Sequence, residues 1–232
     1  MHAKDVMTTQ VVTVSLDAPV AEIAKQLVQR RISAVPVVDA DGRPVGIVSE
    51  GDLMRRPETG GERHPSWWLA LVAEPETQAR EYVKSHGGRA RDVMTRDLVT
   101  VTEEASLEEI ATLLEKHRIK RVPVVREGKL VGIVSRANLL QGIVARQRAL
   151  QPSADDRTLR ERVTQAVRAS GASSQFVDVV VSGGVVHLWG ATYTEAERDA
   201  IQVAVASVMG AKGVEGQIGV FSPMVRGALW AE

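Results

Sequence analysis

The order of apolar and polar residues passes through the same series of patterns twice within the first 145 positions. β-Branched runs at 11–14 and 98–101 predict two short strands. Apolar residues spaced three and four apart follow each run and predict amphipathic helices. The apolar faces of these helices are Val20, Ile23, Ala24 and Leu27 in the first copy and Leu107, Ile110, Ala111 and Leu114 in the second. Pro19 suits the first turn of one helix, and Ser106 suits the N-cap of the other.

Two further apolar runs follow each predicted helix and flank a residue pair that is typical of tight turns. The turn pairs are Asp41-Gly42 and Glu127-Gly128, and they predict two hairpins. A short helix is expected after each hairpin, near Gly51 and near Ala137. Each copy is therefore a β-α-β-β-α unit. Because one copy offers too little core to be stable alone, we expect the two copies to pack sheet to sheet as a pseudo-symmetric pair.

A third periodic region follows the two copies and has a different order of elements. Leu159, Val163, Ala166 and Val167 mark a helix, and residues 177–181 and 185–189 are strands around Gly183-Gly184, a strong hairpin signal. A helix at 194–209 and a strand at 214–220 complete an α-β-β-α-β domain. The fold class predicted for the whole chain is mixed α/β, of the α+β kind.

These patterns set the expected boundaries. The repeats are 1–54 and 91–148, a helical insertion at 55–90 separates them, a linker covers 149–156, the third domain covers 157–222, and a tail covers 223–232. The insertion holds Trp67 and Trp68. They either pack the insertion onto the pair of repeats or form a lid or a dimer contact.

Short motifs also recur in the same order in both copies. Asp5-Val6-Met7-Thr8 returns at 92–95, Val35-Pro36-Val37-Val38 returns at 122–125, and Gly46-Ile47-Val48-Ser49 returns at 132–135. The repeat resembles the cystathionine-β-synthase (CBS) domain, and the two copies resemble a tandem CBS pair, or Bateman module. The family's pattern of Gly, two apolar residues, Ser, two variable residues and Asp ends in Asp52 in the first copy. The second copy departs from it, because Asn138 stands at the last position.

The third domain resembles the BON domain, on its α-β-β-α-β order and the run Val185-Val186-His187-Leu188-Trp189-Gly190. The CBS resemblance implies an adenosyl ligand, such as AMP, ADP, ATP or S-adenosylmethionine, in clefts between the repeats. The BON resemblance implies a protein or phospholipid partner. We also expect a homodimer through the CBS pairs, because the helical faces of such a flat pair stay partly apolar unless they are covered.

The chemistry of an adenosyl site can be assigned to residues of the first copy. Asp52 accepts hydrogen bonds only, and its two oxygens can take both ribose hydroxyls, while Ser49 can reach ribose or phosphate. An apolar slot for adenine is expected from Val12, Val14, Ala34 and Val35. The structural alternative for Asp52 is a helix N-cap just after a strand.

The second copy offers Val122, Ser135 and Asn138 at the equivalent places, and a basic cluster of His117, Arg118, Lys120 and Arg121. By the family pattern, the residue three before the proline faces phosphate, which is Ser33 in one copy and Lys120 in the other. The alternative for the cluster is a solvated helix end. Because the amide of Asn138 has one acceptor oxygen, a ribose should sit better beside Asp52, and Asn138→Asp should create or tighten a second site.

Composition excludes several classes of function. Lys and Arg together number 29, as do Asp and Glu, so no basic excess points to nucleic acid. The chain has no cysteine, and its five His residues are scattered, without metal-ligand spacing. No catalytic motif is present, so we expect neither an enzyme nor a catalytic cofactor. The N-terminus lacks an apolar signal-peptide segment and no apolar run is long enough to span a bilayer, which predicts a cytoplasmic protein without a transmembrane segment.

Three hypotheses follow. The first is a non-catalytic regulatory protein that senses an adenosyl ligand and passes the change to the third domain or to a partner. The second is a ligand-free CBS dimer that serves as a scaffold presenting BON domains. The third is a nucleotide-acting enzyme such as a hydrolase. Titration with adenine nucleotides separates the first two, and a turnover assay tests the third.

Overall fold

The structure is a computed structural model that describes residues 1–54, 82–146 and 154–221. The expected tail, Trp67 and Trp68 with most of their insertion, and much of the expected linker lie outside the described residues. The chain divides into two compact units. The first unit is Val11–Thr100 with Val125–Val131, and the second is Met1–Gln10, Val101–Val124 and Gly132–Glu232. Within the described ranges, no helix is both long and apolar enough to cross a membrane.

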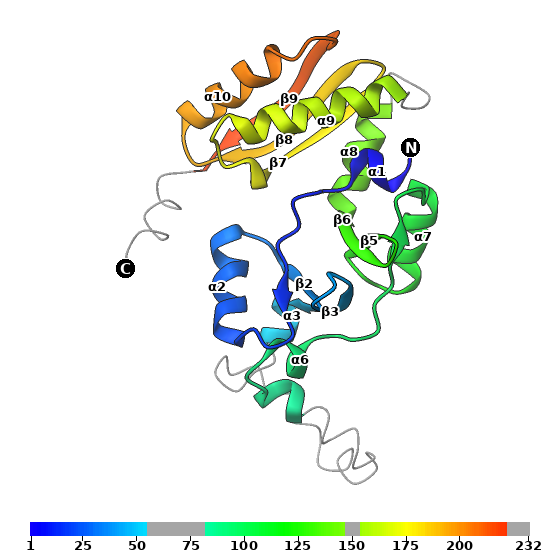
Figure 1. Ribbon diagram of the computed structural model, residues 1–232, viewed down its shortest axis with the longest axis vertical. Helices are drawn as coiled ribbons and strands as arrows, with labels where there is room; N and C mark the ends of the chain where they lie inside the picture. The colour runs from blue at the N-terminus through cyan, green and yellow to red at the C-terminus, as the bar shows by residue number, and fades with distance from the viewer. Residues whose placement is uncertain (55–81, 147–153, 222–232) are drawn as a thin grey trace. The chain divides into compact units, whose positions relative to one another are not determined.

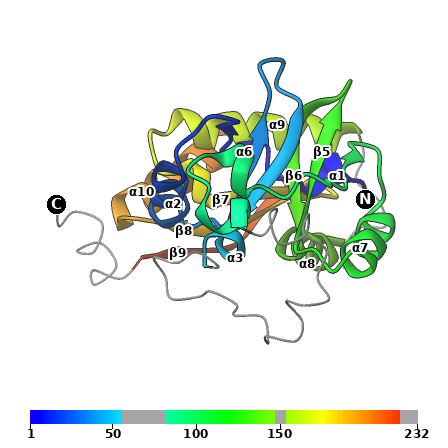
Figure 2. The same ribbon diagram turned by 90° about the horizontal axis from the view of Figure 1, so that it is seen from below.

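The first unit contains the first repeat. Its elements are β1 (Val14–Ser15), α2 (Val20–Arg30), β2 (Ala34–Val38), β3 (Pro44–Ser49), α3 (Glu50–Leu53) and α6 (Ala90–Val93). The sheet order is β1-β2-β3, with β1 parallel and β3 antiparallel to β2. The β2–β3 hairpin (Figure 2) turns through Gly42 with φ of 80°, which confirms the predicted turn. The core beneath the sheet is made by Ile23, Leu27, Val35, Val37, Val48 and Val93.

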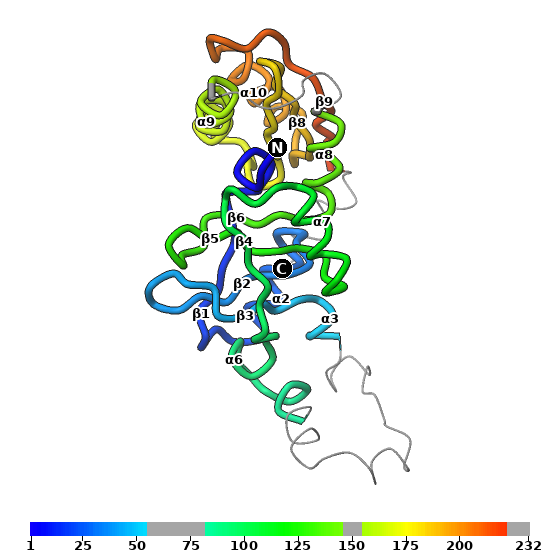
Figure 3. Tube along the Cα trace, turned by 90° about the vertical axis from the view of Figure 1, so that its right-hand side faces the viewer, coloured from blue at the N-terminus to red at the C-terminus, as the bar shows by residue number. Residues whose placement is uncertain are grey.

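The second unit contains most of the second repeat and the third domain, whereas the turn of the repeat's hairpin, Val125–Val131, belongs to the first unit. The repeat comprises β4 (Val101–Thr102), α7 (Leu107–Lys116), β5 (Arg121–Arg126), β6 (Lys129–Ser135) and α8 (Arg136–Arg146), with sheet order β4-β5-β6. The predicted N-cap is confirmed, because the Ser106 hydroxyl accepts from the Glu109 amide at 3.1 Å. The N-terminal turn α1 (Ala3–Val6) packs against α8, as Figures 1 and 3 show from two directions.

The first strand of each repeat differs from its prediction. Strands were expected at 11–14 and 98–101, but β1 and β4 are two residues long and begin at the end of each run. β-Branched residues favour extended backbone, but a strand exists only where it finds a partner. In the first repeat the partner is the end of β2, where Val14 lies opposite Val37 and Ser15 opposite Val38.

The third domain has the predicted α-β-β-α-β order, with one added 3₁₀ turn. Its elements are α9 (Ala154–Ala169), the turn η2 (Ser174–Phe176), β7 (Val177–Ser182), β8 (Val185–Thr192), α10 (Glu195–Ala206) and β9 (Gly213–Val220). In the sheet β7-β8-β9 the first pair is antiparallel and the second parallel. Helices α9 and α10 lie side by side across one face (Figure 1), around a core that includes Val163, Leu188 and Ile201.

Helix α9 begins at Ala154, inside the segment expected to be a linker. The carboxylate of Asp156 accepts hydrogen bonds from the amides of Gly183 and Gly184, at 3.1 and 2.7 Å. Asp156 is therefore part of the third domain, because it fixes the β7–β8 turn.

Each repeat opens with a segment that ends in Thr8 or Thr95, and this segment is paired with a strand of the other repeat. The sequence patterns did not indicate this pairing. The Thr8 amide and carbonyl bond to Ile133 on β6, both at 3.0 Å, and Thr95 bonds to Ile47 on β3 in the same way, at 2.9 and 3.0 Å. The preceding methionines need room that only glycine leaves. A Cβ on Gly46 would lie 2.3 Å from the sulfur of Met94, and one on Gly132 would lie 2.4 Å from that of Met7. Because Gly46 and Gly132 have no side chain, the segments that contain Met94 and Met7 can pack directly against β3 and β6.

Candidate functional site

The first Gly-x-x-Ser motif ends in a tight polar cluster where β3 passes into α3. The carboxylate of Asp52 accepts from the amide and the hydroxyl of Ser49, at 2.9 and 2.6 Å. Ser49 is the N-cap of α3 and Asp52 is the third helical residue, so the two form a capping box. The alternative in which Asp52 is the N-cap is therefore wrong, because Ser49, three residues earlier, occupies that position. Asp52 is only 7% exposed, and the cluster holds its carboxylate in one orientation.

A lysine from outside the repeat completes this cluster. Lys84, in the helical residues 82–86, places its ammonium 2.8 Å from Oδ1 of Asp52 and donates to the hydroxyl of Thr95 at 3.2 Å. Burial by itself would raise the pKa of Asp52, but the hydrogen bonds from Lys84 and Ser49 outweigh it and the pKa is lowered. The first site therefore contains an ionised acceptor and a cation side by side.

The second motif has the same geometry with a different charge. Oδ1 of Asn138 accepts from the amide and the hydroxyl of Ser135, at 2.8 and 2.7 Å. The other end of the amide donates to the carbonyl of Val6 at 3.1 Å. Asn138 is 2% exposed. Its acceptor and its donor are therefore both engaged, and the donor holds the N-terminal segment of the chain.

Most of the predicted residues of the first copy lie at one end of its sheet. Ala34 on β2 is paired with Ser49 on β3, and the carbonyl of Ser33 accepts from the Glu50 amide at 3.0 Å. These contacts bring Ser33 and Ala34 beside the capping box that contains Asp52. Val14 and Val35 are buried in the repeat's core, and Val12 packs against it half-buried.

The second copy repeats the backbone contact that brings Ser33 to the first motif, with Lys120 in the place of Ser33. Lys120 is exposed before β5, and its carbonyl accepts from the Arg136 amide at 3.2 Å. Arg121 is half-buried at the start of β5, and Val122 is fully buried. His117 and Arg118 are exposed where α7 ends, which is the solvated arrangement expected of a basic helix terminus.

Three residues near the sites, Thr8, Thr95 and Lys84, differ in how well the sequence indicated their role. Thr8 and Thr95 end the repeated Asp-Val-Met-Thr motif, so the repeat itself marked them. Lys84 lies in the insertion between the repeats, and nothing in its neighbours indicates that it reaches Asp52. Within the described ranges, His, Asp and Glu do not gather in groups of three that could hold a metal ion.

Comparison with known proteins agrees with this architecture. A CBS-domain family model matches residues 3–58 and 90–145, and a BON-domain family model matches residues 155–220. The CBS domain-containing protein YhcV of Bacillus subtilis is 32% identical over 136 residues, which are 59% of this chain and 81% of that protein. This chain belongs to the CBS-domain family. Its third domain is a BON domain.

Two further relatives of the CBS pair are informative. The uncharacterized protein MJ1426 of Methanocaldococcus jannaschii is 30% identical over 155 residues, which are 62% of this chain and 92% of that protein. The chain in a crystal structure of CBSX2 in complex with AMP is 27% identical, with a TM-score of 0.54, and the match covers 62% of this chain and 96% of the crystallised chain. The CBS pair of this chain is thus similar to one that binds a nucleotide.

Proposed function

We propose that this protein is a non-catalytic regulatory protein that senses an adenosyl ligand at its CBS pair. The ligand is AMP, ADP, ATP or S-adenosylmethionine, and its binding is relayed to the BON domain or to a partner protein. The observation that carries the proposal is the cluster of Ser49, Asp52 and Lys84 in the first repeat. The similarity to CBSX2, which was crystallised with AMP, supports it.

The cluster suits the polar part of a nucleotide. The ionised Asp52 carboxylate accepts hydrogen bonds and cannot donate them, so it matches the two hydroxyl donors of a ribose. Lys84 has a side chain that is 32% exposed, and its flexible ammonium can leave Asp52 for a phosphate when the ribose takes its place. The ligand acts as a signal only if it binds two geometries of the protein with different affinity.

Calorimetric titration of the full chain with AMP, ADP, ATP, S-adenosylmethionine and NAD tests the proposal. We expect at least one ligand to bind in the micromolar range, or about 7–8 kcal/mol. Asp52→Asn should weaken that ligand about ten- to a hundredfold, because one charge-assisted hydrogen bond is worth about 1.5–3 kcal/mol. The exposed Asp199→Asn is the matched control and should bind like the native protein. No heat and no thermal shift with any of the five ligands at millimolar concentration would refute the proposal.

One observation favours a second candidate function, a ligand-free scaffold that displays BON domains. Asp52 already accepts two bonds from Ser49 and one from Lys84, so helix capping alone accounts for its placement. A scaffold of this kind predicts that Asp52→Asn changes thermal stability and no ligand affinity. The same titrations therefore separate the two candidates.

A further inference from the structure

Strand β7 of the BON sheet is covered on both of its faces. On β7 the side chains of Val179 and Val181 belong to the domain's own core beneath α9 and α10. Because side chains alternate along a strand, Asp178 and Val180 point to the opposite face. Val180 is nonetheless completely buried, and both α8 and α1 pack against β7. The second CBS repeat and the N-terminal turn therefore cover β7 on this outer face.

Four side chains close a ring of hydrogen bonds across this contact. The amide nitrogen of Asn138 lies 3.4 Å from both the Thr8 hydroxyl and the Gln141 carbonyl oxygen. Thr8 in turn donates to one oxygen of Asp178 at 2.9 Å, and Gln141 donates to the other at 3.3 Å. We call Thr8, Asn138, Gln141 and Asp178 the polar ring. Every donor in the polar ring points from the CBS motif toward the carboxylate of the BON domain.

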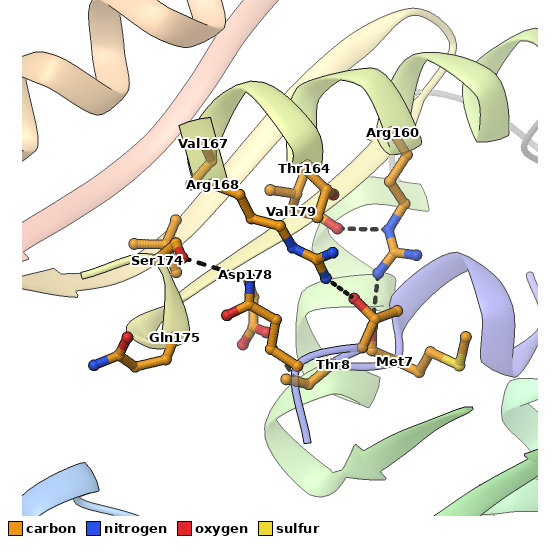
Figure 4. Close-up of a pocket in the computed structure, with 13 residues that line it drawn as sticks. Met7, Thr8, Arg160, Thr164, Val167, Arg168, Ser174, Gln175, Asp178 and Val179 are labelled. Atoms are coloured by element: carbon orange, nitrogen blue, oxygen red, sulfur yellow. Dashed lines mark hydrogen bonds between the residues drawn. The ribbon is translucent and has the colours of Figure 1, made fainter. Parts of the chain in front are cut away.

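Two arginines of α9 in the BON domain, Arg157 and Arg160, also bind the N-terminal segment. Arg157 pairs with the buried carboxylate of Asp5 at 2.9 Å. Arg160 reaches from α9 and donates to the carbonyls of Lys4, Met7 and its own domain's Val179, each at 2.7 Å, as Figure 4 shows for Met7 and Val179. Burial lowers the pKa of Arg160, and the negative charges of Asp5 and Asp178 oppose that shift. The carbonyls at the end of α1, which lack helical partners, thus bind a guanidinium of the BON domain.

The space left at this junction is small. A cavity of about 30 Å³ lies beneath Arg160, with Thr8, Arg168 and Asp178 among its lining residues (Figure 4). This volume accommodates one or two water molecules and no nucleotide. The cavity therefore lies between the N-terminal segment Met7–Gln10 and the BON domain, and it is too small for a nucleotide.

We propose that the second CBS motif is the docking site of the BON domain, and that adenosyl binding is confined to the first motif. The docking role explains why asparagine stands at 138. The polar ring needs a donor there, and a carboxylate would oppose both the Val6 carbonyl and Asp178. At the first motif the requirement is reversed, because Asp52 faces the cation of Lys84. The statement about ligand number depends on the proposed function, while the docking statement does not.

The experiment compares variants of the full chain by ¹⁵N relaxation in NMR, which measures how fast each domain tumbles. In the native protein the amides of 154–221 should tumble with those of the second repeat. Gln141→Glu places a second carboxylate against Asp178 and leaves the BON sequence intact. We expect it to favour undocking about ten- to a hundredfold, so that the BON amides tumble faster while their signals stay dispersed. Adding Asp178→Asn should restore joint tumbling, because it removes the repulsion.

The exposed Gln217→Glu is the matched control and should behave like the native protein. Independent tumbling of the native BON domain, or joint tumbling in Gln141→Glu, would overturn the docking site. Calorimetry with AMP then counts ligands. One AMP per native chain supports the assignment and two would overturn it. If AMP does not bind, the count is made with whichever of ADP, ATP, S-adenosylmethionine or NAD does bind. If none of the five binds, the proposed function fails, and the relaxation data alone decide whether the BON domain docks.

Discussion

Replacement of Asn138 by aspartate tests the interpretation of the second motif most directly. From sequence alone, Asn138→Asp gains an acceptor for a ribose and should create a ligand site. The contacts predict the opposite result, a loss of stability. The variant keeps the two bonds from Ser135 but loses the donor that holds the Val6 carbonyl at 3.1 Å.

The size of the effect follows from these contacts. Leaving the buried Val6 carbonyl without its donor costs about 1–3 kcal/mol. The new carboxylate is also buried, since Asn138 is 2% exposed, and it stands one hydrogen-bonded neighbour away from Asp178. We therefore expect Asn138→Asp to lower the free energy of unfolding by about 2–4 kcal/mol. For a chain of this length, that lowers the melting temperature by about 4–16 °C.

The pH dependence of the destabilisation by Asn138→Asp provides a second check of its cause. The two bonds from Ser135 favour ionisation of the new carboxyl, but burial, the Val6 carbonyl and the charge of Asp178 oppose it, and among the described residues no cation like Lys84 is in contact. We therefore expect the pKa of this carboxyl to be raised in the folded state, so that the folded protein holds the proton more tightly than the unfolded chain. Below the unfolded pKa of about 4 the carboxyl is protonated in both states and can donate to Val6. The destabilisation should therefore be small at pH 4 and should grow as the pH rises through the folded pKa.

The assay is thermal unfolding measured by scanning calorimetry at pH 4 and at pH 7. Each variant is compared with the native protein at the same pH. Gln217→Glu adds the same charge at an exposed position and should leave the melting temperature within about 1 °C. If Asn138→Asp melts like the native protein at pH 7, the hydrogen bond to Val6 does not hold the N-terminal segment. If it binds a second equivalent of AMP, the original expectation from sequence is correct.

Three further predictions concern other parts of the chain. Lys84→Met should cost about 1–2 kcal/mol at pH 7, measured by denaturant titration, whereas the exposed Lys129→Met should cost little. Because the pKa of Asp52 lies below its ordinary value of 3.8, its contribution is present above that value and disappears as the pH falls through the folded pKa, so the cost of Lys84→Met should vanish in acid. The native protein should be a homodimer by light scattering, and Ile143→Glu, on the exposed apolar side of α8, should give a 25.1 kDa monomer. Residues 153–232, expressed alone, should give dispersed amide signals in NMR, because the BON domain has its own core.

Each of these predictions has an outcome that contradicts it. A pH-independent cost of Lys84→Met would show that its ion pair with Asp52 is not the cause. A native species of 25.1 kDa at tens of micromolar would rule out the dimer at that concentration. A collapsed spectrum of residues 153–232 would show that the BON domain needs the second repeat to fold.

Features that depend on neighbouring residues could be predicted from the sequence. The turns at Gly42 and Gly184 were evident because a positive φ favours glycine, and each turn lies between two apolar runs. The cap at Ser106 followed from its position directly before an amphipathic segment. The repeat itself identified Ser49, Asp52 and their counterparts as one motif.

Features that depend on distant partners could not be predicted in this way. Nothing local shows that Thr8 pairs with β6 or that Lys84 reaches Asp52, because both contacts form only when segments far apart in sequence meet. The Asn at 138 was noticed as a departure from the family pattern, but its cause lies in Val6 and in the rest of the polar ring. From the sequence, we interpreted Asn138 as a weaker ribose ligand. From its contacts, we interpret it as a donor that the docked BON domain needs.

The pairing of the N-terminal segment with the second unit has a consequence for how the chain is made. Residues 1–10 leave the ribosome before the residues that they contact, because Thr8 bonds to Asp178, which is 170 positions later. At about 5–20 residues per second, the delay between the two is about 10–30 s. Val6 and Met7, which are buried in the finished protein, cannot be buried until the second repeat, with Gly132 and Gly142, has been made. Residues 1–10 are thus among the last of the described residues to reach their native positions, and their removal should weaken the contact with the BON domain.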